Sequence, residues 1–195
     1  MSPPEGPYVS RGGEKLAAAL DAFKLDVSGW ACADFGCNVG GFTDYLLRRG
    51  AARVYAVDTG YGALDWRLRK DPRVVVMERT NALYAAPPAG GVNLAVVDVA
   101  FTPQRLIVPA AGRWLSPGGQ VVSLLKPHYE LAKSPARKAP GRKLIDEALA
   151  EEVRRNVCQE LQGLGFAVVG CIRSPLRGKG GNPEFLLHIR PGQAV

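Results

Sequence analysis

The chain of 195 residues contains 25 lysines and arginines against 18 aspartates and glutamates, a formal net charge of +7. With 47% hydrophobic and 22% charged residues it has the composition of a globular protein, which excludes disorder as its main state, and we expect one domain over residues 1–195. No apolar run approaches the ~18 residues that cross a bilayer, and the first residues lack a signal segment. We therefore expect a cytoplasmic protein without membrane contact.

Strand-like and helix-like segments alternate along most of the chain, which is typical of an α/β fold with a largely parallel sheet. A leading helix is expected around residues 16–23, with Ser10 as its cap. Apolar runs predict strands over residues 30–35, 53–58, 73–77, 94–99 and 120–125. Amphipathic patterns predict helices over residues 41–49, 103–115 and 144–164.

The carboxyl-terminal part departs from this alternation. Residues 166–172 and 184–189 are typical of strands, and the segment between them is rich in glycine, proline and basic residues and contains no helical pattern. Adjacent strands without a crossover helix pair in antiparallel fashion. The sequence therefore predicts a mixed sheet that ends in an antiparallel hairpin.

The cysteines and the basic residues are distributed in informative ways. No Cys-x-x-Cys pair occurs and neither histidine lies at metal-ligand spacing from a cysteine, so we expect no metal site and no disulfide framework. Buried thiols are expected at Cys32, Cys37, Cys158 and Cys171. Residues 131–143 form a proline-containing loop without acids, for which phosphate contact and simple solvation are equal alternatives. Its basic residues are Lys133, Arg137, Lys138, Arg142 and Lys143.

A glycine-rich turn over residues 34–42 follows the first strong strand and opens a helix. Glycines let the backbone approach a ligand, and the helix terminus offers free N–H groups, so we interpret this segment as a cofactor loop. Asp58 ends the next strand, where a carboxylate can bind both hydroxyls of a ribose. An ordinary strand-to-helix turn with two capping acids is the alternative. The candidate cofactor residues of the turn are Asp34, Gly36, Asn38, Gly40, Gly41 and Phe42.

The glycine spacing discriminates between nucleoside cofactors. A dinucleotide fingerprint needs a glycine at its third position, where this chain has Asn38, and this disfavours NAD. S-adenosylmethionine carries no phosphate, and its ammonium group needs a carboxylate that Asp34 can provide. We assign Asp58 to its ribose and Asn81, after the third strand, to its adenine.

Three charged residues are predicted to meet at one edge of the sheet. Asp98 ends the fourth strand, Lys126 follows the fifth, and Glu184 begins the last strand, which runs the other way. If the last strand inserts beside the fifth, these residues form a row on strands about 4.8 Å apart. Lys15 on the leading helix would close the row into a cluster. Taken singly, each residue is typical of a surface charge, whereas the convergence indicates a site.

The sequence around this row restricts the methyl acceptor. Transfer to an exocyclic amine usually uses an Asp/Asn-Pro-Pro-aromatic loop, but residues 98–101 are Asp-Val-Ala-Phe. Methylation of a pyrimidine carbon needs a cysteine, and none lies near Asp98 or Lys126. A hydroxyl acceptor remains, toward which Lys126 can act either as a base or as an orienting donor. Asp98 is also a candidate cofactor-binding residue.

Several segments together resemble a known family. They are residues 8–16 (Tyr-Val-Ser-Arg-Gly-Gly-Glu-Lys-Leu), 40–44, 57–62, 71–74, 78–81, 126–127 and 182–187 (Asn-Pro-Glu-Phe-Leu-Leu). In this order they resemble the TlyA branch of the FtsJ/RrmJ-like 2′-O-ribose methyltransferases. The resemblance implies a Rossmann-like seven-stranded fold with helices on both faces, S-adenosylmethionine as cofactor, and ribosomal RNA methylated on cytidine ribose. It also implies the catalytic set Lys15, Asp98, Lys126 and Glu184.

The chain departs from this branch in two places. Members carry a small RNA-binding domain before the segment that starts here at Tyr8, and only seven residues precede it. The loop over residues 131–143 also differs from the family sequence that follows Lys-Pro-Gln-Phe-Glu, here residues 126–130. We assign RNA contact to the basic residues of that loop and to Arg11, Arg177 and Lys179. A catalytically silent RNA-binding or ribosome-assembly module is the alternative function. Some members of the family are called haemolysins, but no segment here is suited to membrane insertion.

Overall fold

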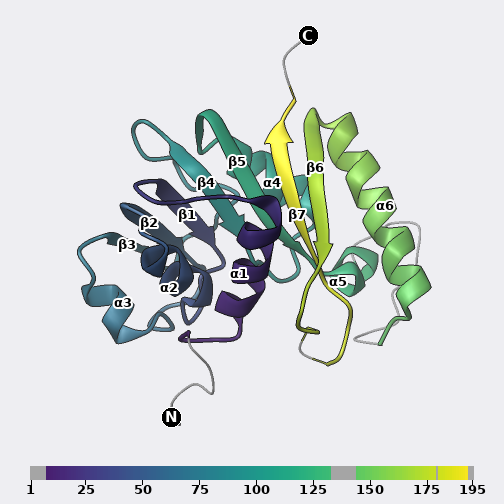
Figure 1. Ribbon diagram of the computed structural model, residues 1–195, viewed down its shortest axis with the longest axis horizontal. Coiled ribbons are helices and arrows are strands. Elements are labelled where there is room, and N and C mark those ends of the chain that lie inside the picture. Colours follow the sequence, from purple (N-terminus) through teal and green to yellow (C-terminus); the bar gives the residue numbers. More distant parts are fainter. Residues whose placement is uncertain (1–7, 133–143, 179, 193–195) are drawn as a thin grey trace.

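A twisted sheet with helices against both faces makes up the computed structural model of this chain (Figure 1). The structure describes residues 8–132, 144–178 and 180–192. In this part of the chain, seven strands lie in the order β3-β2-β1-β4-β5-β7-β6. Their bounds are β1 Ala31–Phe35, β2 Arg53–Val57, β3 Val74–Met77, β4 Val92–Val97, β5 Leu115–Leu125, β6 Phe166–Arg173 and β7 Phe185–Pro191.

The strand directions agree with the prediction of a mixed sheet. The first five strands pair in parallel, whereas β7 runs antiparallel to β5 on one side and to β6 on the other. The register of β5 and β7 sets Leu125 opposite Phe185. Because of this register, the residue after β5 and the residue before β7 reach the same edge of the sheet.

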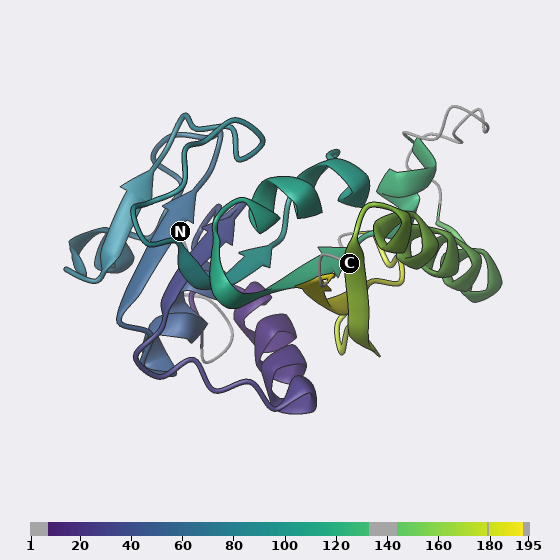
Figure 2. The same cartoon turned by 90° about the horizontal axis from the view of Figure 1, so that it is seen from above.

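Helices cover the two faces of the sheet, as Figure 2 shows from above. Helices α1 and α2 pack together on one face, and α4, α5 and α6 lie on the other. The bounds of the helices are α1 Gly12–Phe23, α2 Gly41–Arg48, α3 Trp66–Lys70, α4 Gln104–Gly112, α5 Pro127–Ala132 and α6 Glu147–Gly163. The seven-stranded α/β fold that the sequence predicted is confirmed.

Successive side chains of a strand point to opposite faces of the sheet, so each strand contributes to the hydrophobic core on both faces. On β4, Leu94 and Val96 belong to the core under α1 and α2, and Ala95 and Val97 belong to the core under α4 and α6. All four are fully buried. Fully burying a side chain such as Val or Leu contributes about 1.5–3 kcal/mol, so a strand that is apolar on both sides is held in the middle of the sheet.

Two short helices and one strand start were not predicted. Helix α3 follows its cap Asp65, and α5 starts with Pro127 at its first position. One or two helical turns are too short to show a 3.6-residue period, which explains why both were missed. Strand β5 begins at Leu115, before the position predicted, because its first residues pair with Val92 across a register shift.

The predicted helix ends are displaced by their caps. Helix α6 starts after Asp146, whose side chain accepts the Leu149 N–H at 2.8 Å, and not at residue 144. Its stripe of Ala150, Val153, Val157 and Leu161 is buried. At α1 the cap position is Arg11, and Ser10 Oγ accepts the Gly12 N–H at 3.3 Å, so the assignment of Ser10 as the cap residue was wrong by one position.

The cysteines are all free thiols, and their burial differs from the prediction at two of them. Cys32 and Cys37 are buried, as expected, whereas Cys158 is half-buried and Cys171 is exposed. Cys171 lies on β6, the edge strand, whose residues alternate between the protein and solvent. An apolar residue type in a strand does not by itself indicate that both faces of the strand are covered.

Candidate active site

A cavity of about 1160 Å³ opens at the carboxyl ends of the parallel strands. Its walls come from the loops after β1, β2, β3, β4 and β5, from the start of α1 and from the residue before β7. In open α/β sheets, ligands bind in this crevice at the point where the strand order reverses, which is here between β1 and β4. The cavity is therefore the candidate active site.

The glycine turn after β1 brings its backbone close to the opposite wall. Gly36 has a φ of 84°, and a Cβ at this position would lie 2.7 Å from the carbonyl oxygen of Asp98. Gly36, Asn38, Gly41 and Phe42 line the cavity. Gly40 does not: a Cβ there would meet the side chains of Leu64 and Leu68, so its glycine serves the turn into α2. The assignment of Gly40 to the cofactor is therefore not supported by its position.

Asp34 presents an unpaired carboxylate oxygen at the floor of this turn. Its Oδ2 accepts hydrogen bonds from the Thr43 N–H at 2.9 Å and from the Thr43 hydroxyl at 2.7 Å. Its Oδ1 is buried and has no hydrogen-bond partner among the described residues. Burial raises the pKa of Asp34 to about 7, and the charges of Asp98 and Asp58 act in the same direction.

The unpaired oxygen fits a cation that enters the cavity. An ionised carboxyl group that is buried without a partner is unfavourable, and an ammonium group beside Oδ1 would relieve this. Thr43, which orients the carboxylate, was missed by sequence reasoning. Its only signal was its place in the first turn of the helix that follows the glycine turn.

Asp58 anchors the loops on the other side of the cavity. Its Oδ1 accepts the Gly60 N–H at 2.7 Å and its Oδ2 accepts the Asn38 N–H at 2.9 Å. Each carboxylate oxygen has a further lone pair for a ribose hydroxyl. Asn81 also lines the cavity, where its Oδ1 accepts the Leu83 N–H at 3.0 Å. The contacts of Asp58 thus join the glycine turn to the loop after β2.

Removal of the Asp58 carboxylate tests its assignment to the cofactor ribose. We expect Asp58→Ala to weaken S-adenosylmethionine binding by about 1.5–3 kcal/mol, the range for a hydrogen bond to a charged group. Isothermal titration calorimetry on the purified variant measures this. Asp58→Asn keeps an acceptor oxygen and should lose less affinity. An unchanged dissociation constant for Asp58→Ala would contradict the assignment.

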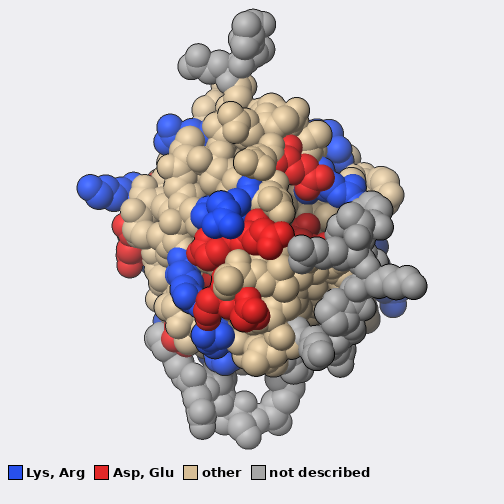
Figure 3. Space-filling model, turned by 90° about the vertical axis from the view of Figure 1, so that its right-hand side faces the viewer, with Lys and Arg blue, Asp and Glu red and all other residues tan. Residues whose placement is uncertain are grey.

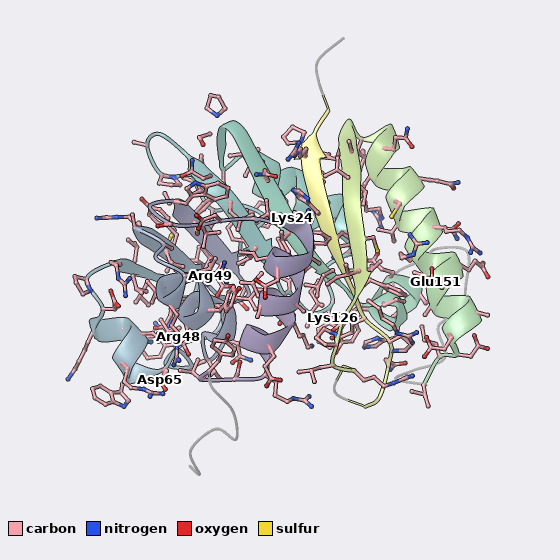
Figure 4. The ribbon with its side chains drawn as sticks, in the orientation of Figure 1. Lys24, Arg48, Arg49, Asp65, Lys126 and Glu151 are labelled. Atoms are coloured by element: carbon pink, nitrogen blue, oxygen red, sulfur yellow. The ribbon has the colours of Figure 1, made fainter. Side chains whose placement is uncertain are left out.

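The four predicted catalytic side chains surround one end of the cavity as two ion pairs. Lys126 Nζ lies 2.6 Å from Asp98 Oδ1 and donates to the Val99 carbonyl oxygen at 3.1 Å. Lys15 Nζ lies 2.5 Å from Glu184 Oε2, and both of these residues are buried. Figure 4 shows Lys126 at the lower end of the sheet, where the parallel strands end. The predicted juxtaposition of the four residues is therefore present.

Three aromatic residues to which no role was assigned from the sequence lie beside these ion pairs. Phe101, His128 and Tyr129 line the cavity, and the rings of Phe101 and Tyr129 are 4.6 Å apart between centroids. Burial and the charge of Lys126 lower the pKa of His128 below its usual value, so its ring is neutral near pH 7. These aromatic residues follow Asp98 and Lys126 closely in the sequence, and this proximity was the signal that could have indicated their place in the site.

The predicted RNA-contacting residues have different outcomes. Arg11 is exposed at the cavity wall. Arg177 pairs with Glu147 at 2.6 Å, and Arg173 pairs with the same carboxylate, so neither is a free cation in this structure. Figure 3 shows the face that carries α6, on which acidic and basic side chains lie next to each other. Lys133, Arg137, Lys138, Arg142, Lys143 and Lys179 lie outside the described residues.

Comparison with known proteins identifies the family. The family model described as FtsJ-like methyltransferase matches residues 8–190. This chain belongs to the FtsJ-like methyltransferases. The family that the sequence motifs resembled is therefore confirmed.

Relatives and solved structures agree with this membership. The chain is 44% identical over 188 residues to the 16S/23S rRNA (cytidine-2′-O)-methyltransferase TlyA of Mycobacterium tuberculosis, a match over 95% of this chain and 69% of that protein. A structure described as a candidate hemolysin from Streptococcus thermophilus has a TM-score of 0.89 and 41% identity, over 97% of this chain and 69% of that one. A candidate S-adenosylmethionine-dependent methyltransferase from Listeria monocytogenes shares the fold, with a TM-score of 0.62 and 16% identity over 93% and 99% of the two chains.

Two kinds of arrangement are absent from the residues that the structure describes. None of the helices in this part of the chain is long and apolar enough to cross a bilayer. Within the same residues, no group of three or more histidine, cysteine, aspartate or glutamate side chains is arranged to hold a metal ion.

Proposed function

We propose that this FtsJ-like methyltransferase transfers the methyl group of S-adenosylmethionine to the 2′-hydroxyl of a ribose in RNA. The observation that carries the proposal is the meeting of the Lys126–Asp98 and Lys15–Glu184 pairs in the same cavity as the unpaired Oδ1 of Asp34. We further propose ribosomal RNA as the substrate and cytidine as the nucleoside, because the curated TlyA relative carries both in its name.

Asp34 and Asp58 would hold the cofactor at its two ends. Asp34 Oδ1 is the oxygen for its ammonium group, and Asp58 is the carboxylate for its ribose hydroxyls. When bound, S-adenosylmethionine supplies a methyl group activated by a sulfonium charge. Gly36, in the glycine turn between these two acids, lines the cavity and packs too closely against the Asp98 backbone for a side chain.

Lys126 is arranged as an orienting donor. An ammonium group has three N–H bonds, and here Asp98 and the Val99 carbonyl oxygen accept two of them. The third is available to the 2′-oxygen of a bound ribose, which it would hold with a lone pair toward the methyl group. We favour this role over that of a base, which the sequence left equally open.

The hydroxyl proton needs an acceptor when the new carbon–oxygen bond forms. Asp98 and Glu184 are the carboxylates of the row, and each is already held by one lysine. The lysines fix these carboxylates so that one can take the proton without a large change in geometry. Lys15, which is buried against Glu184, is thus assigned to orienting that carboxylate.

Transfer of a labelled methyl group tests the reaction and its acceptor. The protein is incubated with radiolabelled S-adenosylmethionine and with total RNA, isolated ribosomal subunits or DNA. We expect label in RNA and none in DNA, because DNA lacks the 2′-hydroxyl. Digestion to nucleosides and mass spectrometry should then assign the methyl group to the ribose of cytidine.

The same experiment separates the enzyme from the alternative of a silent RNA-binding module. A silent module would retain RNA in a filter-binding assay but transfer no label to any RNA. Label on DNA, or on the base of a nucleoside, would contradict the proposed acceptor. The salt concentration is kept constant across the assays, because phosphate contacts make the affinity for RNA salt-dependent.

A further inference from the structure

Gln104, the first residue of α4, holds the chain just before Lys126. Its side chain is buried, donates from Nε2 to the Leu124 carbonyl oxygen at 3.4 Å, and accepts from the Ser123 hydroxyl at 2.6 Å. Both partners lie in the last three residues of β5. The end of the strand that leads into Lys126 is therefore tied to the start of α4.

The chain just after Lys126 is also held by Gln104, in this case through the Gln104 backbone. Glu130 on α5 accepts the backbone N–H of Gln104 at its Oε1, at 2.9 Å. Within α5, the N–H groups of Tyr129 and Glu130 donate to the Lys126 carbonyl oxygen at 2.9 Å and 3.3 Å. Lys126 is thus the link between two segments that Gln104 holds, one through its side chain and one through its backbone.

The position of these two segments matters because the ammonium group of Lys126 has to lie within hydrogen-bond distance of several groups at once. Its Nζ is shared between Asp98 and the Val99 carbonyl oxygen, which lie in the loop after β4 and not in the segments that Gln104 holds. A shift of about 1 Å in a reacting or orienting group is enough to lower a rate by about 10²-fold. The position of α5 along the edge of the sheet therefore sets whether the third N–H reaches the acceptor.

We propose that Glu130 is a positioning residue for Lys126: its carboxylate holds α5 against the start of α4, and it holds α5 more weakly when it is protonated. The inference rests on the proposed function, which assigns Lys126 to the reaction. A hydrogen bond to an ionised carboxylate is roughly twice as strong as one to a neutral acceptor, and an anion at the first N–H of a helix is further favoured.

Burial, more than the charged groups around it, raises the pKa of Glu130 into the neutral range. Burial raises the pKa of Glu130 to about 7, and the bond from Gln104 acts against this. Glu160 on α6 raises the pKa further and Arg105 on α4 lowers it, while these two residues also pair with each other at 3.5 Å. His128, on α5 itself, has a lowered pKa and so titrates at lower pH.

The test compares wild type with Glu130→Gln, which has the shape of the protonated acid and cannot ionise. Single-turnover methylation is measured at saturating S-adenosylmethionine, with the RNA that the wild-type protein methylates, between pH 6 and pH 8. We expect nearly equal rates at pH 6 and a wild-type rate about 3- to 10-fold higher at pH 8. The ratio of the two rates cancels titrations that both proteins share.

Controls separate positioning from folding and from cofactor binding. Glu151→Gln, on the outer side of α6 in Figure 4, should match wild type at both pH values. The dissociation constant for S-adenosylmethionine should be unchanged in Glu130→Gln. A ratio that does not vary with pH, or a loss of cofactor affinity that parallels the rate, would overturn the inference.

A second measurement does not depend on activity. In wild type, the backbone amide resonance of Gln104 should titrate with a midpoint near the pKa of about 7 of its partner, and in Glu130→Gln it should not titrate there. A flat Gln104 resonance in wild type would overturn the inference. If wild type transfers no methyl group to RNA but the resonance titrates, the proposed function fails while the contact of Glu130 stands.

Discussion

Replacing Asp34 with asparagine should abolish S-adenosylmethionine binding and at the same time stabilise the ligand-free protein above pH 7. The Oδ1 of Asp34 is buried and has no partner in the part of the chain that the structure describes, and burial raises the pKa of the group to about 7. Above this pH the free protein carries a buried, incompletely paired charge that asparagine lacks. We expect the free energy of unfolding to rise by about 1–3 kcal/mol in the variant, the range for one unsatisfied buried polar group.

The pH dependence of this effect has a defined sign. The pKa of Asp34 is raised from 3.8 in the reference state to about 7 in the folded protein, so the folded state binds the proton more tightly. Wild type should therefore lose stability relative to Asp34→Asn as the pH rises from about 4 to about 7, with a constant difference above that. The affinity of wild type for S-adenosylmethionine should rise over the same pH range, because only the ionised carboxylate can pair with the ammonium group.

Urea unfolding at pH 5 and pH 8 and calorimetric titration with S-adenosylmethionine measure the two effects. Asp21→Asn is the matched control, since Asp21 is exposed and its contact with Arg49 is a surface ion pair of 3.4 Å. It should change neither quantity appreciably. Binding of the cofactor to Asp34→Asn with wild-type affinity would refute the role assigned to Asp34.

Lys126→Ala should reduce the rate of methyl transfer by about 10²–10⁴-fold, because it removes the group that orients the 2′-oxygen and holds Asp98, a candidate acceptor of the proton. The dissociation constant for S-adenosylmethionine should stay within about twofold of wild type, because the residues assigned to the cofactor are on other loops. The Asp98 side chain, 27% exposed, remains accessible to water after the substitution, so the fold should be little affected. Single-turnover kinetics measures the rate of methyl transfer, and calorimetry on the same preparation measures the dissociation constant for S-adenosylmethionine.

Two variants serve as controls for Lys126. Lys126→Arg keeps the charge but replaces a compact ammonium by a planar fork, so it should restore little activity if a single N–H has to be placed. Lys24→Gln removes an exposed lysine beyond the other end of α1, as Figure 4 shows, and should leave the rate unchanged. A parallel loss of rate and cofactor affinity in Lys126→Ala would indicate a structural role instead.

Local patterns in the sequence were sufficient for the architecture and for part of the site. Three features follow from short-range rules of chain geometry: the apolar run that forms β4, the glycines between Asp34 and the following helix, and the absence of a helix between β6 and β7. These rules need only neighbouring residues, so they can be applied before the fold is known. For the same reason they missed α3 and α5, which are too short to show a period.

The contacts that perform chemistry were decided by the tertiary structure. That Lys126 pairs with Asp98 and Lys15 with Glu184 depends on the insertion of β7 beside β5 and on the packing of α1. The unpaired Oδ1 of Asp34 depends on how completely its neighbours exclude water. Pairing and burial are properties of residues far apart in the chain, and the electrostatic energy of a charge changes with both. The sequence thus determined which residue types reach this edge of the sheet, and only the tertiary structure determined their partners and their exposure to water.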